Sequence, residues 1–186
     1  MTSFKTAAAL LLLSLCVVCA APSPSGASRA AQGRVTVRAK GRRSVVLTER
    51  GRSHTLDLTK HIDAAKIEDV SLLLLTYGGE FAYVVLNVCG LSKMPPDDRQ
   101  CGAGIECNVV WLKLDRARRV SDGQNARYES CWAPITSDEG PKVSARRLTL
   151  ALEDLREEVR REVTYDADSP EGGLKVTQSA IPKSNP

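Results

Sequence analysis

The chain has 186 residues, a formal net charge of +4 and an aromatic content of only 4%. This length suffices for one domain with a proper core, and with so few aromatic residues that core must consist mainly of Val, Leu and Ile. The modest net charge hides a basic segment on an acidic remainder, and we expect no nucleic acid as a partner.

The N-terminus has the pattern of a secretory signal peptide. Lys5 precedes the apolar run AAALLLLSLCVVCA, which is too short to span a bilayer. Val18 and Ala20 suit a cut after Ala20, and the alternative, an uncleaved anchor, is disfavoured by the short run. We therefore expect residues 1–20 to be removed, no membrane span, and a protein that is secreted or lies in the lumen of the secretory or endolysosomal pathway.

Residues 21–53 form a basic segment. It holds eight Lys or Arg residues and one acid, Glu49, whereas residues 54–186 are net acidic. The beginning, PSPSGAS, is typical of a linker, so we expect a basic flexible arm over 21–53. The arm could contact anionic glycans. Two alternatives stay open: a short hairpin around Gly41, and processing at the dibasic pair Arg42-Arg43 in KGRR.

Four cysteines follow the signal segment. An even number of cysteines in an oxidising compartment predicts disulfides. Zinc ligation is disfavoured because the spacings are not of the CxxC type and because His54 and His61 lie far upstream. We expect no metal and no cofactor. The four cysteines are Cys89, Cys101, Cys107 and Cys131.

From residue 54 to residue 114 the pattern is that of β-strands. HTLDL alternates with period two, and VSLLLLTY and FAYVVLNV are strand-like runs joined at Gly78-Gly79, a hairpin-type turn. NVVWLKL follows the cysteine-containing loop as a further strand. Short strands with turns between them predict an antiparallel sandwich or barrel.

The C-terminal third is ambiguous. Leu148, Leu150 and Leu152 alternate as in a strand, but Leu152, Leu155 and Val159 continue the apolar stripe of a helix. Helix propensity favours a helix over about 152–162. We expect residues 169–186 to form a C-terminal tail, in which LKVTQSAI could be one last edge strand.

Three segments resemble a known family. LDLTKHI, YGGEFAYVVLNVCGL and CGAGIECNV resemble the repeat of mannose-6-phosphate receptors and the wider mannose-6-phosphate receptor homology (MRH) domains. The match covers about residues 55–110 and is weaker to 150. The resemblance implies a flattened antiparallel β-barrel of two crossed sheets, with an MRH-like β domain over 54–168. The late cysteines of the family are absent.

The resemblance also implies a sugar pocket. Family members bind mannose through Gln, Arg, Glu and Tyr. Asn108 stands at the glutamine position and is one methylene shorter, Arg147 or Arg146 corresponds to the arginine, and Tyr165 is the late tyrosine. No glutamate is assigned. For the disulfides, we expect Cys101–Cys107 across the GAGIE loop and, since the family partners of the other two are missing, Cys89–Cys131.

Two functions follow as hypotheses. The first is a carbohydrate-binding module of the MRH type that recognises mannose-type glycans or glycoproteins. The second is a non-lectin secreted interaction protein that keeps the barrel and has lost the sugar pocket. The sequence contains no GxSxG, HExxH or P-loop motif, and we do not expect an enzyme.

Overall fold

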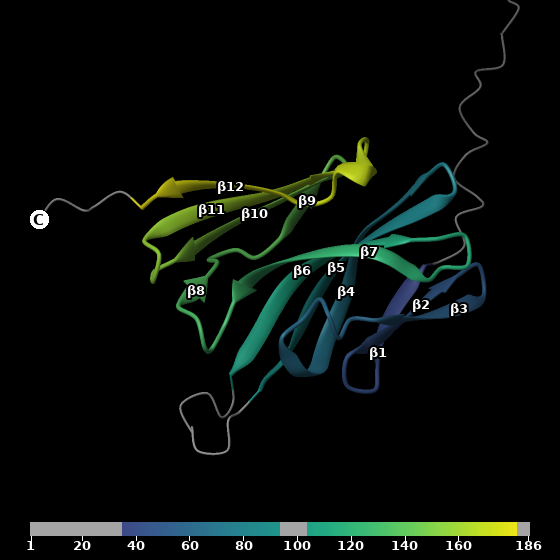
Figure 1. Ribbon diagram of the computed structural model, residues 1–186, viewed down its shortest axis with the longest axis horizontal. Coiled ribbons are helices and arrows are strands. Elements are labelled where there is room, and N and C mark those ends of the chain that lie inside the picture. The colour runs from purple at the N-terminus through teal and green to yellow at the C-terminus, as the bar shows by residue number, and fades with distance from the viewer. Residues whose placement is uncertain (1–34, 94–103, 182–186) are drawn as a thin grey trace, which may run out of the picture. The chain divides into compact units, whose positions relative to one another are not determined.

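The protein folds into three antiparallel β-sheets (Figure 1). The computed structural model describes residues 35–93 and 104–181. Within these ranges there are twelve strands, one short 3₁₀ turn and no α-helix. The mainly β fold is therefore confirmed. The strand order of each sheet is an open path, so of the two expected arrangements, a barrel or a sandwich, the closed barrel is not formed.

The N-terminal sheet contains β1 (Thr36–Lys40), β2 (Ser44–Glu49) and β3 (Arg52–Asp57), in that order. Alternation decides its orientation: Val45 and Leu47 are fully buried, whereas the basic residues of β1 are exposed. The flexible arm expected over 21–53 is thus wrong for its described part, and the hairpin alternative around Gly41 is confirmed. The expected domain boundary at residue 54 falls inside β3.

The middle sheet has the order β4-β5-β6-β7. Its strands are β4 (Ala64–Gly78), β5 (Phe81–Ser92), β6 (Ile105–Leu114) and β7 (Val120–Glu129). The predicted hairpin at Gly78-Gly79 is confirmed: Gly78 pairs with Phe81, and Gly79 has a φ of 60°, which glycine adopts without strain. Strands predicted from FAYVVLNV and NVVWLKL are confirmed as β5 and β6.

The C-terminal sheet has the order β12-β11-β10-β8, and β9 also pairs with β10. Its elements are β8 (Ile135–Thr136), β9 (Lys142–Ser144), β10 (Arg147–Asp154), β11 (Val159–Asp166), the 3₁₀ turn η1 (Pro170–Gly172) and β12 (Lys175–Ala180). The tail expected over 169–186 therefore contains β12, the edge strand that LKVTQSAI suggested. Residues 182–186 lie outside the described ranges.

The helix expected over 152–162 is absent; β10 and β11 form a hairpin there. Asp154 ends β10 and accepts hydrogen bonds from the backbone N–H groups of Arg156 and Glu157. Glu158 has a φ of 54°, outside the helical region. The turn thereby breaks the helical stripe, and Leu155, which that stripe placed inside, is 56% exposed.

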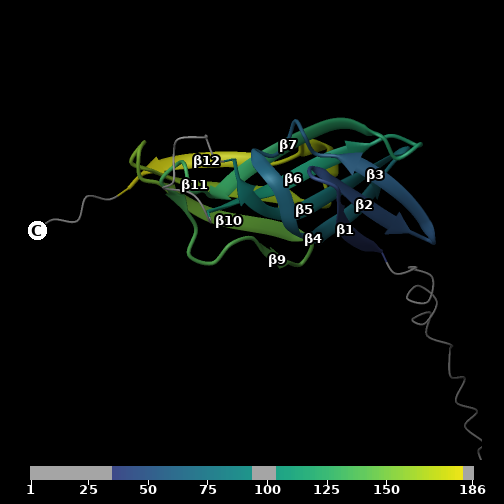
Figure 2. The same ribbon diagram turned by 90° about the horizontal axis from the view of Figure 1, so that it is seen from below.

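The core lies on both faces of the middle sheet, whose neighbouring sheets are seen from a second direction in Figure 2. Alternate residues of β5 and β6 point to opposite faces. One face packs against the N-terminal sheet and the other against the C-terminal sheet. The first cluster includes Val45, Leu47, Leu56, Val84, Leu86, Val110 and Leu112. The second includes Tyr83, Val85, Val109, Trp111, Leu150, Leu152, Val163 and Tyr165.

The disulfide pairing also differs from the prediction. Cys89 is bonded to Cys107, with a Cα–Cα distance of 4.2 Å. The two residues lie directly opposite each other on β5 and β6, so the strand register brings their side chains together. This bond excludes both expected pairs, Cys101–Cys107 and Cys89–Cys131. Cys131 is disulfide-bonded as well, and Cys101 lies outside the described residues.

We expect non-reducing peptide mapping to recover a peptide pair joined by Cys89 and Cys107. For Cys131 we expect Cys101 as the partner, because it is the remaining cysteine after the predicted cleavage point. In agreement, Cys131 lies against Gly104, where a Cβ would come within 2.4 Å of the Cys131 sulfur. Recovery of Cys101 linked to Cys107 would contradict the register of β5 and β6.

The described residues contain no helix that is long and apolar enough to cross a membrane. Residues 1–34, which include the predicted signal segment and the start of the basic arm, lie outside the described ranges.

Candidate functional site

Asn108, the first residue of the predicted sugar pocket, is buried on β6, on the face that carries Val110 and Leu112. Its Oδ1 accepts a 3.4 Å hydrogen bond from Nδ2 of Asn125. Its own Nδ2 makes no hydrogen bond within the described part of the chain. Asn108 therefore belongs to the layer between the middle and N-terminal sheets.

The other two predicted pocket residues lie elsewhere. Tyr165 is buried in the cluster on the opposite face of the middle sheet, and this burial raises the pKa of its hydroxyl. Arg147 is 70% exposed and forms an ion pair with Asp166 at 3.0 Å. Its alternative, Arg146, binds Asp168 at 2.9 Å on the surface. The structure does not bring Asn108, Arg147 and Tyr165 together.

A buried polar cluster near Asn108 contains residues that the sequence analysis missed. Glu106 is 1% exposed, and its Oε1 accepts hydrogen bonds from the Ser92 hydroxyl at 2.9 Å and the Cys131 backbone N–H at 3.1 Å. Oε2 of Glu106 lies 3.5 Å from Nη1 of Arg127. The other terminal nitrogen of Arg127, Nη2, lies 3.7 Å from a carboxylate oxygen of Asp63. The sequence signal that could have found this cluster is Glu106, a charged residue at an inward position of the otherwise apolar strand β6. This cluster holds the chain together at the ends of β5, β6 and β7.

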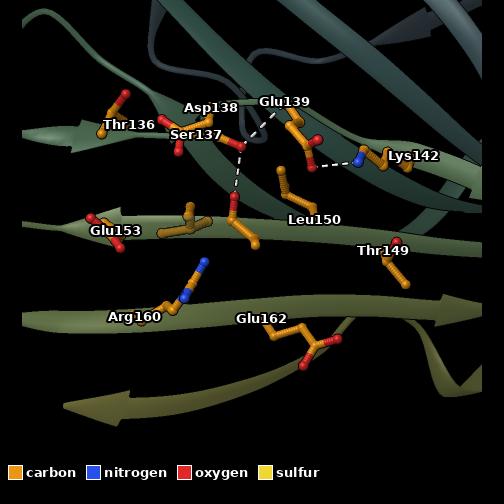
Figure 3. A pocket seen from close by; sticks show the side chains of 13 residues that line it. Thr136, Ser137, Asp138, Glu139, Lys142, Thr149, Leu150, Glu153, Arg160 and Glu162 are labelled. Atoms are coloured by element: carbon orange, nitrogen blue, oxygen red, sulfur yellow. Dashed lines mark hydrogen bonds and ion pairs between the residues drawn. The ribbon is translucent and has the colours of Figure 1, made fainter. Parts of the chain in front are cut away.

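A polar groove of about 310 Å³ lies on the outer face of the C-terminal sheet (Figure 3). The Ser137 hydroxyl donates to the Ala151 carbonyl at 2.6 Å and accepts from the Gly140 N–H, which fixes the loop that borders the groove. Lys142 is paired with Glu139. Acids outnumber cations in the groove, so it is unfavourable for an anion; the charged residues are Asp138, Glu139, Lys142, Glu153, Arg160 and Glu162.

The outer face of the N-terminal sheet is basic. Arg38 and Lys40 lie two residues apart on the same face of β1, a separation of about 7 Å. The turns at the two ends of β2 add further cations, and a six-residue strand separates these ends by about 17 Å. Four exposed cations lie on the outer face of β1 or in these turns: Arg38, Lys40, Arg42 and Arg50. We call these four residues the basic face. Arg52 is exposed as well, but it pairs with Glu49 and so lies on the side of β3 that carries Leu56.

Backbone hydrogen bonds from two other segments fix the turn between β1 and β2. The backbone N–H of Ile67 donates to the Arg42 carbonyl, and that of Leu58 donates to the Arg43 carbonyl, both at 2.8 Å. The dibasic pair therefore lies in a tight turn whose carbonyl groups are already bonded. Cleavage after Arg43 would separate β1 from β2.

A buried acid anchors the other end of this sheet. Tyr77 donates a 2.6 Å hydrogen bond to Glu49, and Nε of Arg118 lies 3.3 Å from the same carboxylate. Burial opposes the ionisation of Glu49, but these two partners outweigh it and keep the pKa of Glu49 below its ordinary value. Burial and the bond to Glu49 raise the pKa of Tyr77 to about 12. The one acid inside the basic segment is thus buried and paired, and of the basic face only Arg50 lies near it, at 3.9 Å.

No group of three or more His, Cys, Asp or Glu residues within 35–93 and 104–181 is placed to hold a metal ion. Comparison with known proteins gave no matching family model, curated protein or solved structure.

Proposed function

We propose that this chain is an exported, non-enzymatic interaction protein that binds anionic glycans through the basic face of its N-terminal sheet. The observation that carries the proposal is the segregation of charge: four exposed cations gather on the outer face and turns of a sheet whose acid at Glu49 is buried and paired and whose one exposed acid is Asp57, at the end of β3. The cations spread along a strand and two turns, which suits an extended, repeating anion better than a single compact one.

The mannose-binding function implied by the MRH resemblance is not the basis of this proposal, because Asn108, Arg147 and Tyr165 lie apart. The resemblance itself stays a prediction, supported by strands at the positions of FAYVVLNV and NVVWLKL. The proposal shares with the second of the two hypotheses a secreted interaction protein without the sugar pocket, but not the closed barrel.

Heparin, a sulfated polysaccharide, is the probe for the test. We expect the mature chain to be retained on heparin at low ionic strength and released as salt screens the exposed charges. Changing Arg38, Lys40 and Arg42 together to Gln should weaken heparin binding roughly tenfold or more, because the loss of three neighbouring cations reduces the local positive potential.

The matched control changes the same number of charges on another sheet, by replacing Lys142, Arg160 and Lys175 with Gln. Its net charge equals that of the first variant, so a response to net charge alone would weaken both equally. Equal retention of the two variants would refute the basic face as the binding surface. Circular dichroism verifies that both variants remain folded.

A further inference from the structure

A second concave site lies on the inner side of the C-terminal sheet, away from the basic face. This crevice has a volume of about 480 Å³ and is bordered by β7, the segment 133–135 and the inner face of β10–β12. Pockets of roughly 300–1,000 Å³ with mainly apolar walls and a few polar groups are typical of small-molecule sites. The size therefore suits a small molecule rather than a polymer.

The floor of the crevice is apolar. Leu152 and Val163 belong to the buried core, and Val176 lies directly opposite Val163 on β12. Val176 is nevertheless 54% exposed. Ile135 and Ala126 complete an apolar surface that extends from the core into solvent. An apolar chain bound here would remove this surface from water.

The charged rim is not symmetric. Arg161 is bound by both Asp154, at 3.1 Å, and Glu157, so its guanidinium is fully engaged by two carboxylates. Burial opposes the ionisation of Asp154, but the backbone N–H groups of Glu157 and Arg156 and the Arg161 guanidinium keep the pKa of Asp154 low. Asp154 therefore stays ionised, and both acids are paired with Arg161.

Arg156 differs from the other two arginines of the rim in its lack of an ion pair among the described residues. Its backbone N–H is bound by Asp154, which fixes the turn, but its guanidinium has no carboxylate partner within the described part of the chain. The other arginine at the crevice, Arg127, is engaged by Glu106 and Asp63. An apolar floor next to one unpaired guanidinium is complementary to a molecule with an apolar chain and one negative group.

We propose that this crevice binds a free amphipathic organic anion, namely a monocarboxylate with an apolar chain. The chain lies along Ile135, Leu152 and Val176, and the carboxylate pairs with Arg156. This ligand differs from the polyanion of the basic face in both size and polarity, and the two sites share no residue.

Sodium octanoate tests the proposal, with 1-octanol as the uncharged analogue of equal chain length. Both are titrated into the ¹⁵N-labelled mature chain and followed by NMR. We expect the largest octanoate shifts at the amides of residues 135, 152, 163 and 176. Arg156→Gln should weaken octanoate binding roughly threefold, the size of one exposed charge pair, and leave 1-octanol binding unchanged. Arg160→Gln, on the outer face of the same sheet, should affect neither.

The apolar half of the site is tested separately. Val176→Glu adds a like charge on the crevice floor and should weaken octanoate binding roughly tenfold or more. Val143→Glu, at another exposed valine of the same sheet, is the matched control. The proposal is overturned if octanoate shifts lie outside the crevice, if Val143→Glu weakens binding as much as Val176→Glu, or if Arg156→Gln affects octanol and octanoate alike.

Discussion

Deletion of residues 21–53 should abolish cooperative folding of the mature chain. The deletion removes β1, β2 and the start of β3, and with them the cover over one face of the middle sheet. Val45 and Leu47 are both fully buried, and burial of two such side chains contributes roughly 3–6 kcal/mol. A whole domain is stable by only about 5–15 kcal/mol. Thermal unfolding followed by circular dichroism measures the effect.

A point substitution tests the same packing without removing strands. Leu47→Ala should cost about 2–5 kcal/mol, which lowers the melting temperature by roughly 5–20 °C. Thr48→Ala is the matched control on the neighbouring outward position, where the hydroxyl only bonds the exposed Ser53; it should change stability by less than about 1 kcal/mol. A deletion variant that melts like the intact mature chain would show that the N-terminal sheet does not cover the middle one.

The basic segment shows how charge can mislead a sequence interpretation. Counting charges over 21–53 predicts a solvated arm, yet Val37 and Ala39 alternate with cations as in a half-buried strand, and the run Val45–Leu47 is wholly apolar. The cations occupy the outward positions of that alternation. The alternation of apolar and polar residues along β1 was therefore the informative signal. The high density of charge reflected only the exposed face of the N-terminal sheet.

The middle sheet could be predicted because several local signals agree there. The strand runs are long and apolar, and Gly78-Gly79 supplies the turn between the first two. The segment from Leu148 to Val163 was predicted less well because its apolar residues fit both a helix and a strand. Two features that no propensity scale contains decided the outcome: the cap by Asp154 and the positive φ of Glu158.

The candidate sites could not be predicted from spacing. Whether Asn108 meets Tyr165 depends on which face of a sheet each occupies, and a register change of one residue reverses that face. β6 and β7 have such an irregularity next to Asn108. The pairing of Cys89 with Cys107 depends on the same kind of register, and the crevice depends on where β12 lies relative to β7, which is not a local property of the sequence.

Substitution of Trp111 should have the largest effect of any single change on the opposite face of the middle sheet. Trp111 is 1% exposed on β6, and its ring stacks on Tyr83 with the centroids 6.0 Å apart. Its indole N–H donates a 3.2 Å hydrogen bond to the Pro170 carbonyl, next to the C-terminal sheet. Trp111→Ala should therefore cost about 3–5 kcal/mol, measured by urea unfolding.

Two further variants separate the contributions of Trp111. Trp111→Phe keeps an aromatic ring but leaves the Pro170 carbonyl without its donor, so we expect an intermediate loss of about 1–3 kcal/mol. Trp132→Phe is the matched control, since the chain has only two tryptophans and this change leaves Trp111 as the single fluorophore. In that background the emission of Trp111 should be that of a buried indole and shift to the red on unfolding.

Because Leu47 and Trp111 belong to different clusters on opposite faces of the middle sheet, their effects should be independent. The double variant Leu47→Ala with Trp111→Ala, if enough of it folds in a stabilising osmolyte to be measured, should lose the sum of the two single losses to within about 0.5 kcal/mol. A large deviation from this sum would mean that the two clusters are one core. A Trp111→Ala variant within about 1 kcal/mol of the parent chain would mean that the C-terminal sheet does not pack through Trp111.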